Sequence, residues 1–199
     1  VIDGVCDYVT FISVYVGISL ALSPIVGNDI WFLSIGAGLC HAIQSGAYEL
    51  QRSEYDYWGK GKASSDLPSI NDLIDHGKNK SAIGQIANQL HIGYIRMQYA
   101  FSGVDRNFRH SIKEVLSLAP EKEEKIRELY RELYAPAVNN WSILCANYRT
   151  FAIFVASISG EPQYYFWFEV VALNIALMFL VQKQKLLNDL FTMRLKEII

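Results

Sequence analysis

The chain has 199 residues, of which 51% are hydrophobic and 13% aromatic, and its formal net charge is −2. With a mean hydropathy of +0.14 and a pI near 6.1, the composition favours a membrane protein and gives no basic field for a nucleic-acid partner. Cys6, Cys40 and Cys145 lie far apart in apolar stretches. This spacing excludes the close cysteine pairs of a zinc site or a disulfide framework.

Two uncharged runs open the chain. Residues 8–28 contain no charged side chain, and about 20 apolar residues in a helix are enough to cross a bilayer. A second uncharged run follows at 30–48, after the short stretch SPIVGND, which has the composition of a turn. The pattern predicts a transmembrane helical hairpin.

The chain then becomes charged and rich in turn-forming residues over 49–134. Within it, SAIGQIANQLHIGYIRMQYAF has apolar residues at three- and four-residue spacing, and APEKEEKIRELYRELYAP reads as an amphipathic helix with a proline near its start. We expect a water-exposed helical insertion here.

Two further apolar runs occupy 137–160, interrupted by Arg149, and 162–182, interrupted by Glu169, with SGEP as the turn between them. Their opposite charges can neutralise one another, which lowers the cost of holding either in hydrocarbon. The sequence therefore predicts an all-α, polytopic membrane helical bundle with four spans and a helical cytoplasmic insertion. Its expected segments are a hairpin at 1–50, the insertion at 51–135, and a second hairpin with a C-terminal tail at 136–199.

The positive residues predict the orientation. None of the 18 Lys and Arg residues lies in SPIVGND or SGEP, and all except Arg149 fall in 49–134 or after position 182. Because Lys and Arg in short loops favour the cytoplasmic side, the insertion, the tail and Asp3 are expected to be cytoplasmic.

Two acids, Asp3 and Asp7, precede the first apolar run. Four residues apart on a helix, their carboxylates share one face about a turn apart. Oxygen ligands at this spacing suit Mg²⁺ or Mn²⁺ together with substrate phosphates. The alternative interpretation is that both are ordinary solvated acids at a helix start.

The segment DGVCD leading into an apolar helix resembles the second half of the signature of the CDP-alcohol phosphatidyltransferase family. That signature reads Asp-x-x-Asp-Gly-x-x-Ala-Arg, then a spacer and Gly-x-x-x-Asp-x-x-x-Asp, and Asp3 and Asp7 match its last two acids. The following hairpin and the two later spans resemble the later helices of the family core. The chain opens on Val1 rather than Met, and we expect the first half of the signature to lie upstream.

The resemblance implies an integral-membrane enzyme that transfers a phosphatidyl group from CDP-diacylglycerol to a small alcohol acceptor and releases CMP. It implies that Asp3 is a ligand of Mg²⁺ or Mn²⁺ and that Asp7 is the general base or a further metal ligand. Members of the family are often homodimers, and a bacterial inner membrane is the expected location. With half of the metal site missing, the 199 residues alone are expected to be inactive.

Four further residues are candidate substrate contacts. Arg149 can bind a lipid or acceptor phosphate through its guanidinium, or it can pair with Glu169. Gln44, Tyr48 and Arg52 follow i, i+4, i+8 spacing and form a polar stripe, which suits either substrate contact or hydrogen bonding between helices. His41, in the same run, is expected to be a hydrogen-bonded interior histidine.

Asp72 and Asp75 repeat the spacing of the first acid pair of the signature, but Gly-x-x-Ala-Arg does not follow, so we interpret them as solvated acids. The competing class of function is a non-enzymatic membrane scaffold or subunit whose helical insertion binds a partner. A transporter that uses Arg149 and Glu169 would need a substrate path that four spans hardly provide.

Overall fold

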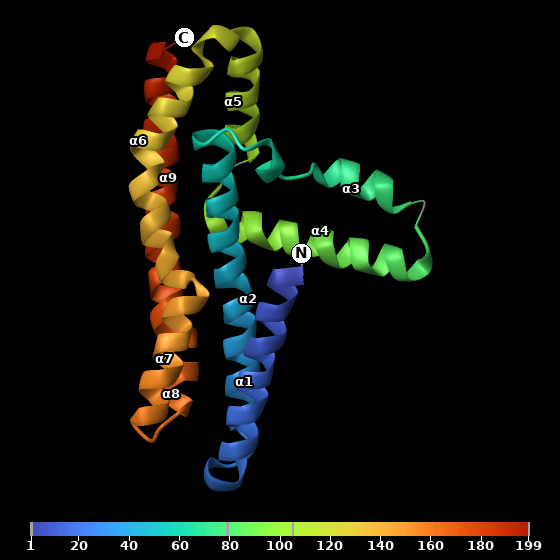
Figure 1. Ribbon diagram of the computed structural model, residues 1–199, viewed down its shortest axis with the longest axis vertical. Helices are drawn as coiled ribbons and strands as arrows, with labels where there is room; N and C mark the ends of the chain where they lie inside the picture. Colours follow the sequence, from blue (N-terminus) through green and yellow to red (C-terminus); the bar gives the residue numbers. More distant parts are fainter. Residues whose placement is uncertain (1, 79, 105, 199) are drawn as a thin grey trace. The chain divides into compact units, whose positions relative to one another are not determined.

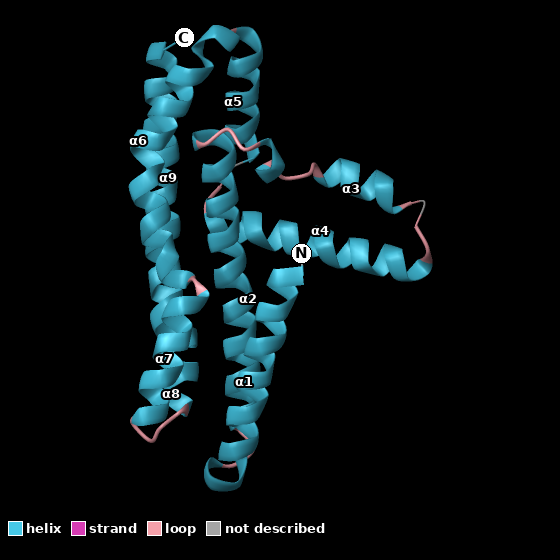
Figure 2. Ribbon diagram, viewed as in Figure 1, coloured by secondary structure: helices cyan, strands magenta, loops and turns pink. Residues whose placement is uncertain are grey.

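The computed structural model describes the backbone of residues 2–78, 80–104 and 106–198, and the side chains of 9–78, 80–104 and 108–198. Within these ranges every regular element is a helix (Figure 2). The all-α prediction is therefore confirmed.

The chain divides into two compact units. Unit 1 contains Val1–Ser45 and Leu144–Leu177, and unit 2 contains Gly46–Ile143 and Met178–Ile199. Two long helices, α2 (Ile30–Glu54) and α9 (Leu173–Ile198), run from one unit into the other (Figure 1). Each unit thus combines two stretches that are separate in the sequence.

Unit 1 combines two helical hairpins. The first joins α1 (Ile2–Val26) to the N-terminal part of α2. The turn between them is shorter than the predicted SPIVGND, because α1 continues through Pro24 to Val26 and only residues 27–29 are non-helical. Gly27 ends α1 with φ +90°, a left-handed conformation that glycine adopts without strain, and its N–H donates to the Ser23 carbonyl at 3.1 Å. The second hairpin joins α7 (Ala146–Ile158) to α8 (Gln163–Trp167), the π-helical turn η5 (Phe168–Ala172) and the start of α9.

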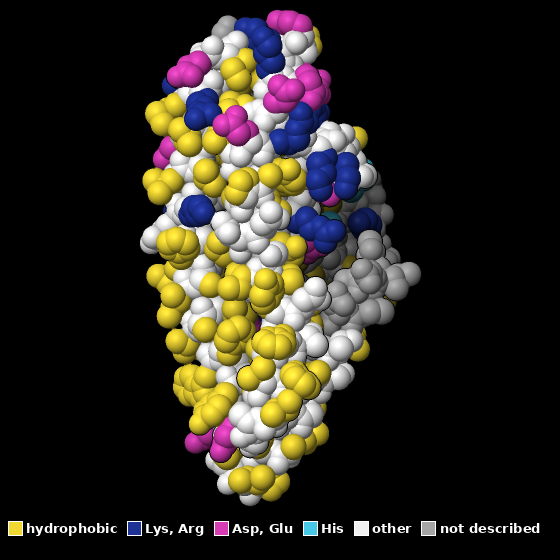
Figure 3. All heavy atoms as spheres, turned by 60° about the vertical axis from the view of Figure 1, so that its left-hand side comes forward, with side chains coloured by type: hydrophobic (Ala, Val, Ile, Leu, Met, Phe, Trp, Pro, Cys, Tyr) yellow, Lys and Arg dark blue, Asp and Glu magenta, His cyan; other side chains and the backbone are white. Residues whose placement is uncertain are grey.

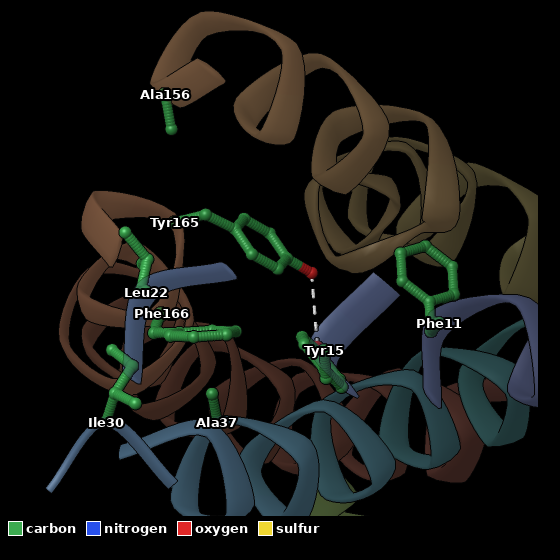
Figure 4. Close-up of a cluster of buried hydrophobic side chains, with 8 residues drawn as sticks. All are labelled: Phe11, Tyr15, Leu22, Ile30, Ala37, Ala156, Tyr165 and Phe166. Carbon is green, nitrogen blue, oxygen red and sulfur yellow. Dashed lines mark hydrogen bonds between the residues drawn. The ribbon is translucent and has the colours of Figure 1, made fainter. Parts of the chain in front are cut away.

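The core of unit 1 forms between these hairpins (Figure 4). Tyr15 and Tyr165 lie at its centre, with stacked rings whose centroids are 5.8 Å apart and hydroxyl oxygens 3.1 Å apart. The other buried members of the cluster are apolar: Phe11, Leu22, Ile30, Ala37, Ala156 and Phe166. A tyrosine pair of this kind links the first hairpin to the second.

Large apolar side chains also cover much of the outer surface (Figure 3). Phe32 is 78% exposed, Phe151 65% and Ile175 64%. Water-soluble proteins rarely expose such side chains in large groups, so the surface of unit 1 is suited to lipid.

Unit 2 contains the middle of the chain, including both helices predicted there. The first is α4 (Ala82–Ser102), capped by the Ser81 hydroxyl, and the second is α6 (Glu123–Trp141). The remaining elements are shorter: η1 (Tyr55–Gly59), η2 (Ala63–Ser65), α3 (Ile70–Gly77), α5 (Arg106–Leu118) and η3 (Pro120–Lys122). At the centre of the core of this unit the Tyr130 and Tyr134 rings of α6 stack, and Phe191 of α9 meets both of them edge-on.

Three helical stretches of the described residues are long and apolar enough to cross a membrane: Val9–Val26, Pro120–Ile158 and Gln163–Ile198. The predicted span at 30–48 is helical but is not among them, because His41, Gln44 and several serines lower its hydropathy. Four crossings therefore remain a prediction, while the membrane class is supported.

The third predicted span differs in detail from the structure. Helix α6 continues through Pro136 to Trp141, and the backbone then passes through the 3₁₀ turn η4 (Ser142–Leu144) before α7 begins. The Arg149 guanidinium donates to the carbonyl of Leu144, the last residue of this turn. A side-chain donor thus satisfies a backbone group that hydrocarbon could not.

Candidate functional site

The predicted acid pair lies on α1. Asp3 and Asp7 both fall within this helix, so their backbone positions are one helical turn apart. Their side chains lie outside the described residues. Among the residues whose side chains are described, no group of three or more His, Cys, Asp and Glu residues could hold a metal ion.

A cluster of buried polar side chains occupies unit 1, and the Glu169 carboxylate is its centre. Oxygen Oε1 accepts from Arg149 Nε at 2.8 Å and from the Tyr15 and Tyr165 hydroxyls, each at 3.0 Å. His41 Nδ1 lies 3.1 Å from the same oxygen. Because these groups come from α1, α2, α7, α8 and η5, one carboxylate joins both hairpins of the unit.

Arg149 is fully buried, and each guanidinium nitrogen has a protein acceptor. Nε bonds Glu169 at 2.8 Å, one terminal nitrogen bonds Gln44 Oε1 at 2.9 Å, and the other bonds the Leu144 carbonyl. The pairing considered from the sequence is therefore present. A phosphate could reach this guanidinium only by displacing one of these bonds.

Gln44 connects the pair to the backbone of η5. Its amide nitrogen donates to the Glu169 carbonyl oxygen at 3.0 Å and to Asn174 Oδ1 at 3.1 Å. Through this side chain, α2 is hydrogen-bonded to the backbone of η5 beside the ion pair.

Tyr48 and Arg52, which the sequence placed with Gln44 in a polar stripe, lie in unit 2. Tyr48 is half-buried and Arg52 is exposed, on the part of α2 that follows Ser45. The structure thus brings Arg149 and Gln44 together, whereas Tyr48 and Arg52 follow on the same helix outside this cluster.

The sequence pointed to some of the cluster and missed the rest. Arg149, Glu169 and Gln44 are conspicuous as polar residues in apolar runs, and His41 is buried and hydrogen-bonded, as expected. Tyr15 and Tyr165 gave no comparable signal, because tyrosine is common in membrane helices. The role of a tyrosine hydroxyl becomes visible only when its hydrogen-bonding partner is known.

A second charged cluster lies in unit 2 around Glu54, at the end of α2. Its carboxylate pairs with Arg109 at 3.0 Å and accepts from the Trp58 indole at 2.8 Å. Burial raises the pKa of Glu54 above its usual range, while the positive charge of Arg109 opposes this shift. Arg109 also pairs with Asp66 at 2.9 Å, and Lys113 pairs with Asp66 at 3.1 Å.

An open pocket of about 510 Å³ borders this cluster and is lined in part by Asp66, Tyr99, Arg109 and Lys113. Each of its two cations already faces a carboxylate. The pocket therefore offers little net positive charge to a phosphate. The cluster is better explained as a structural ion pair that links α2 to α5.

No protein-family model, curated protein or solved structure matches this chain.

Proposed function

We propose that the chain contributes the second half of the active site of an integral-membrane phosphatidyltransferase. The enzyme moves a phosphatidyl group from CDP-diacylglycerol to a small alcohol and releases CMP. One observation carries the proposal: Asp3 and Asp7 are one turn apart in the helix that contains the apolar stretch Val9–Val26, and they directly precede that stretch. Carboxylates so placed would stand at the boundary between lipid and water, where a lipid-linked nucleotide and a water-soluble acceptor meet.

Asp7 would act as the general base. The acceptor oxygen attacks the phosphorus of the phosphatidyl group, the P–O bond to CMP breaks, and the proton of the alcohol passes to the Asp7 carboxylate. Asp3 would hold Mg²⁺ or Mn²⁺, with Asp7 as a further ligand. Such a metal neutralises the pyrophosphate and stabilises the leaving CMP when it is bound.

Two carboxylates fit only part of such a site, because a Mg²⁺ or Mn²⁺ ion that bridges to phosphate normally has further oxygen ligands. The described side chains contain no group of three or more His, Cys, Asp and Glu residues that could hold a metal ion. The proposal therefore requires the acids of the first half-signature, Asp-x-x-Asp-Gly-x-x-Ala-Arg, to come from sequence upstream of Val1.

The buried cluster of unit 1 has a supporting role in this proposal. Tyr15 lies two turns after Asp7 on α1, and its hydroxyl bonds Glu169 at 3.0 Å. This bond fixes the rotation of α1 about its own axis and thereby the direction in which its N-terminal face points. Glu169 and Arg149 would be positioning residues, which act on the acids through Tyr15.

The test is an assay of CMP release with CDP-diacylglycerol, Mn²⁺ and a panel of alcohols: serine, glycerol phosphate and inositol phosphate. The 199 residues alone should be inactive, and the chain extended by its natural upstream sequence should be active. In the extended chain, Asp7→Asn should lower the rate by about 10²- to 10⁴-fold, the usual contribution of a general base.

Asp72→Asn with Asp75→Asn is the matched control. These acids copy the spacing of a signature pair but lie exposed on α3, so their loss should leave the rate unchanged. Robust CMP release from the 199 residues alone, or an extended Asp7→Asn chain with full activity, would contradict the proposal.

The alternative proposal is a membrane scaffold whose insertion binds a partner. It is favoured by three exposed isoleucine and leucine side chains on α4, namely Ile83, Ile86 and Leu90. The upstream sequence separates the two proposals, since a scaffold has no need of the first half-signature.

A further inference from the structure

Helix α4 has two faces of different character. Asn88, Ile92 and Ile95 are buried on one face. The opposite face carries residues at i, i+3 and i+4 spacing, which we name the α4 stripe: Ile83, Ile86, Leu90, Tyr94, Met97 and Phe101. In its first half, Ile83 is 82% exposed, Ile86 63% and Leu90 70%.

The buried face of α4 is covered by α3 at Asn88. The Asn88 amide donates to the Leu73 carbonyl at 2.8 Å, and a Cβ placed on Gly77 would lie 2.4 Å from Asn88 Nδ2. The packing of α3 on Asn88 does not cover Ile83, Ile86 and Leu90, which stay exposed.

Contacts with α2 show which way the stripe faces. The Met97 and Tyr94 side chains lie against Gly46, where a Cβ would be 3.1 Å and 3.4 Å from them. Ser102, on the other face of α4, accepts from Gln51 at 2.7 Å. Gly46 adjoins the uncharged run of α2, whereas Gln51 lies among charged residues. Gln98 of the buried face also lies against Gly46, where a Cβ would be 3.3 Å from it, and the Tyr94 hydroxyl donates to Glu49 at 2.7 Å. The Met97 side of the stripe therefore faces the apolar end of this part of α2.

Contacts with α9 also place the C-terminal end of α4 near the point where an apolar run ends. Gly103, just after α4, packs against the backbone oxygen of Val181, and its own carbonyl accepts from Asn188 at 3.1 Å. Met178 and Phe179 on α9 are each 65% exposed, and Lys183 and Lys185 follow them. The C-terminal end of α4 thus meets both α2 and α9 where their sequences change from apolar to charged.

The direction of α4 differs from that of α2. Helix α4 crosses the C-terminal part of α2 steeply instead of running alongside it (Figure 1). Its 21 residues include one charged side chain, that of Arg96. A helix that crosses two other helices where their sequences change from apolar to charged, with an apolar stripe on the apolar side, has the placement expected of an interfacial helix.

We propose that α4 lies in the plane of the membrane surface, with Ile83, Ile86 and Leu90 inserted among the lipids, and that the partner of the α4 stripe is the bilayer itself. The insertion is then only partly in water, because α4 lies in the membrane surface and α3 lies on its aqueous side. The proposal rests on the membrane location of the chain and is independent of any catalytic role.

A fluorescence experiment on the full chain tests this placement. Cys6, Cys40 and Cys145 are replaced by alanine, and bimane is attached at Leu90→Cys or, as the matched control, at Gln85→Cys. Both positions are exposed, and Gln85 lies on the side of α4 away from the stripe. The protein is reconstituted in vesicles of phosphatidylethanolamine and phosphatidylglycerol, with or without bromine on the acyl chains.

Brominated lipid should quench the label at position 90 severalfold more than the label at 85, and aqueous iodide should show the opposite order. Ile83→Cys should behave like Leu90→Cys, which separates insertion from a local effect of one label. Equal quenching of positions 90 and 85 by iodide would overturn the proposal by placing the stripe in water. Protection of position 90 from both quenchers would also overturn it, because a protein partner or a second copy would then cover the stripe.

Discussion

At the scale of single residues, the most costly feature of the molecule is the ion pair of Arg149 and Glu169. Both side chains are fully buried, and an isolated charge in a low-dielectric interior carries a large desolvation penalty. Arg149 offsets this penalty by placing each guanidinium nitrogen on an acceptor. Glu169 Oε1 is crowded with donors, whereas Oε2 has no hydrogen-bond partner among the described residues.

We predict that Arg149→Met and Glu169→Gln each lower the free energy of unfolding by about 3–5 kcal/mol, because each leaves the other partner buried without its counter-charge. The double variant should lose less than the sum, with a coupling of about 0.5–3 kcal/mol. Denaturant titration in detergent micelles, followed by circular dichroism, measures all three values.

The control for these variants is the surface pair of Arg194 and Glu132. Their charged atoms are 3.2 Å apart, and their side chains are 45% and 66% exposed. Arg194→Met should change the free energy of unfolding by at most about 1 kcal/mol. If Arg149→Met cost no more than Arg194→Met, the buried pair would have no structural importance.

At the scale of elements, the helix ends are determined by a few glycines and side-chain donors. Helix α4 begins at the Ser81 cap, whose hydroxyl accepts from the Gly84 N–H at 3.3 Å, and ends at Gly103 with φ +73°. A left-handed residue at this position turns the chain from α4 toward α5 against Val181. A residue with a Cβ would be strained in its backbone and would also press on the Val181 carbonyl at 3.0 Å.

We predict that Gly103→Ala lowers the free energy of unfolding by about 1–2 kcal/mol through left-handed strain alone, and by more where the backbone of α9 cannot move. Gly93→Ala, inside the same helix, has open space around its Cβ position and should stabilise by about 0.5–1 kcal/mol, since alanine is the better helix former. The same denaturant titration compares the two. A neutral Gly103→Ala would mean that the contact between this turn and α9 does not hold α4 in place.

At the scale of the whole molecule, the helical stretches Pro120–Ile158 and Gln163–Ile198 each contain an apolar segment long enough to cross a membrane, and a tight turn joins the two stretches. Gly160 in that turn has φ +78°, and the turn contains no Lys or Arg. Two crossings joined in this way return the chain to the side from which it came. The cation-rich 51–135 segment and the tail after position 182 are therefore expected on one face, and the 159–162 turn on the other.

Labelling with a membrane-impermeant maleimide tests this arrangement in vesicles of known sidedness. Ser64→Cys and Lys196→Cys, both exposed, should react from the same side, which we expect to be cytoplasmic. Glu161→Cys should react only from the opposite side. Reaction of Glu161→Cys from the side that labels Ser64→Cys would contradict a two-crossing hairpin.

The sequence by itself determined the helical class, the turn SGEP, a turn within SPIVGND, and the membrane character, because the length of an apolar run and its flanking turn residues act locally. It also singled out Arg149, Glu169 and Gln44, since a polar side chain in an apolar run needs a partner. Only the tertiary structure decided that Tyr15, Tyr165 and His41 share the Glu169 carboxylate, and that α4 crosses α2 where the charged residues begin. Those facts depend on which helix faces which. Packing between segments that are distant in the sequence decides this, as for Tyr15 and Glu169, which are more than a hundred residues apart. No local sequence pattern encodes such packing.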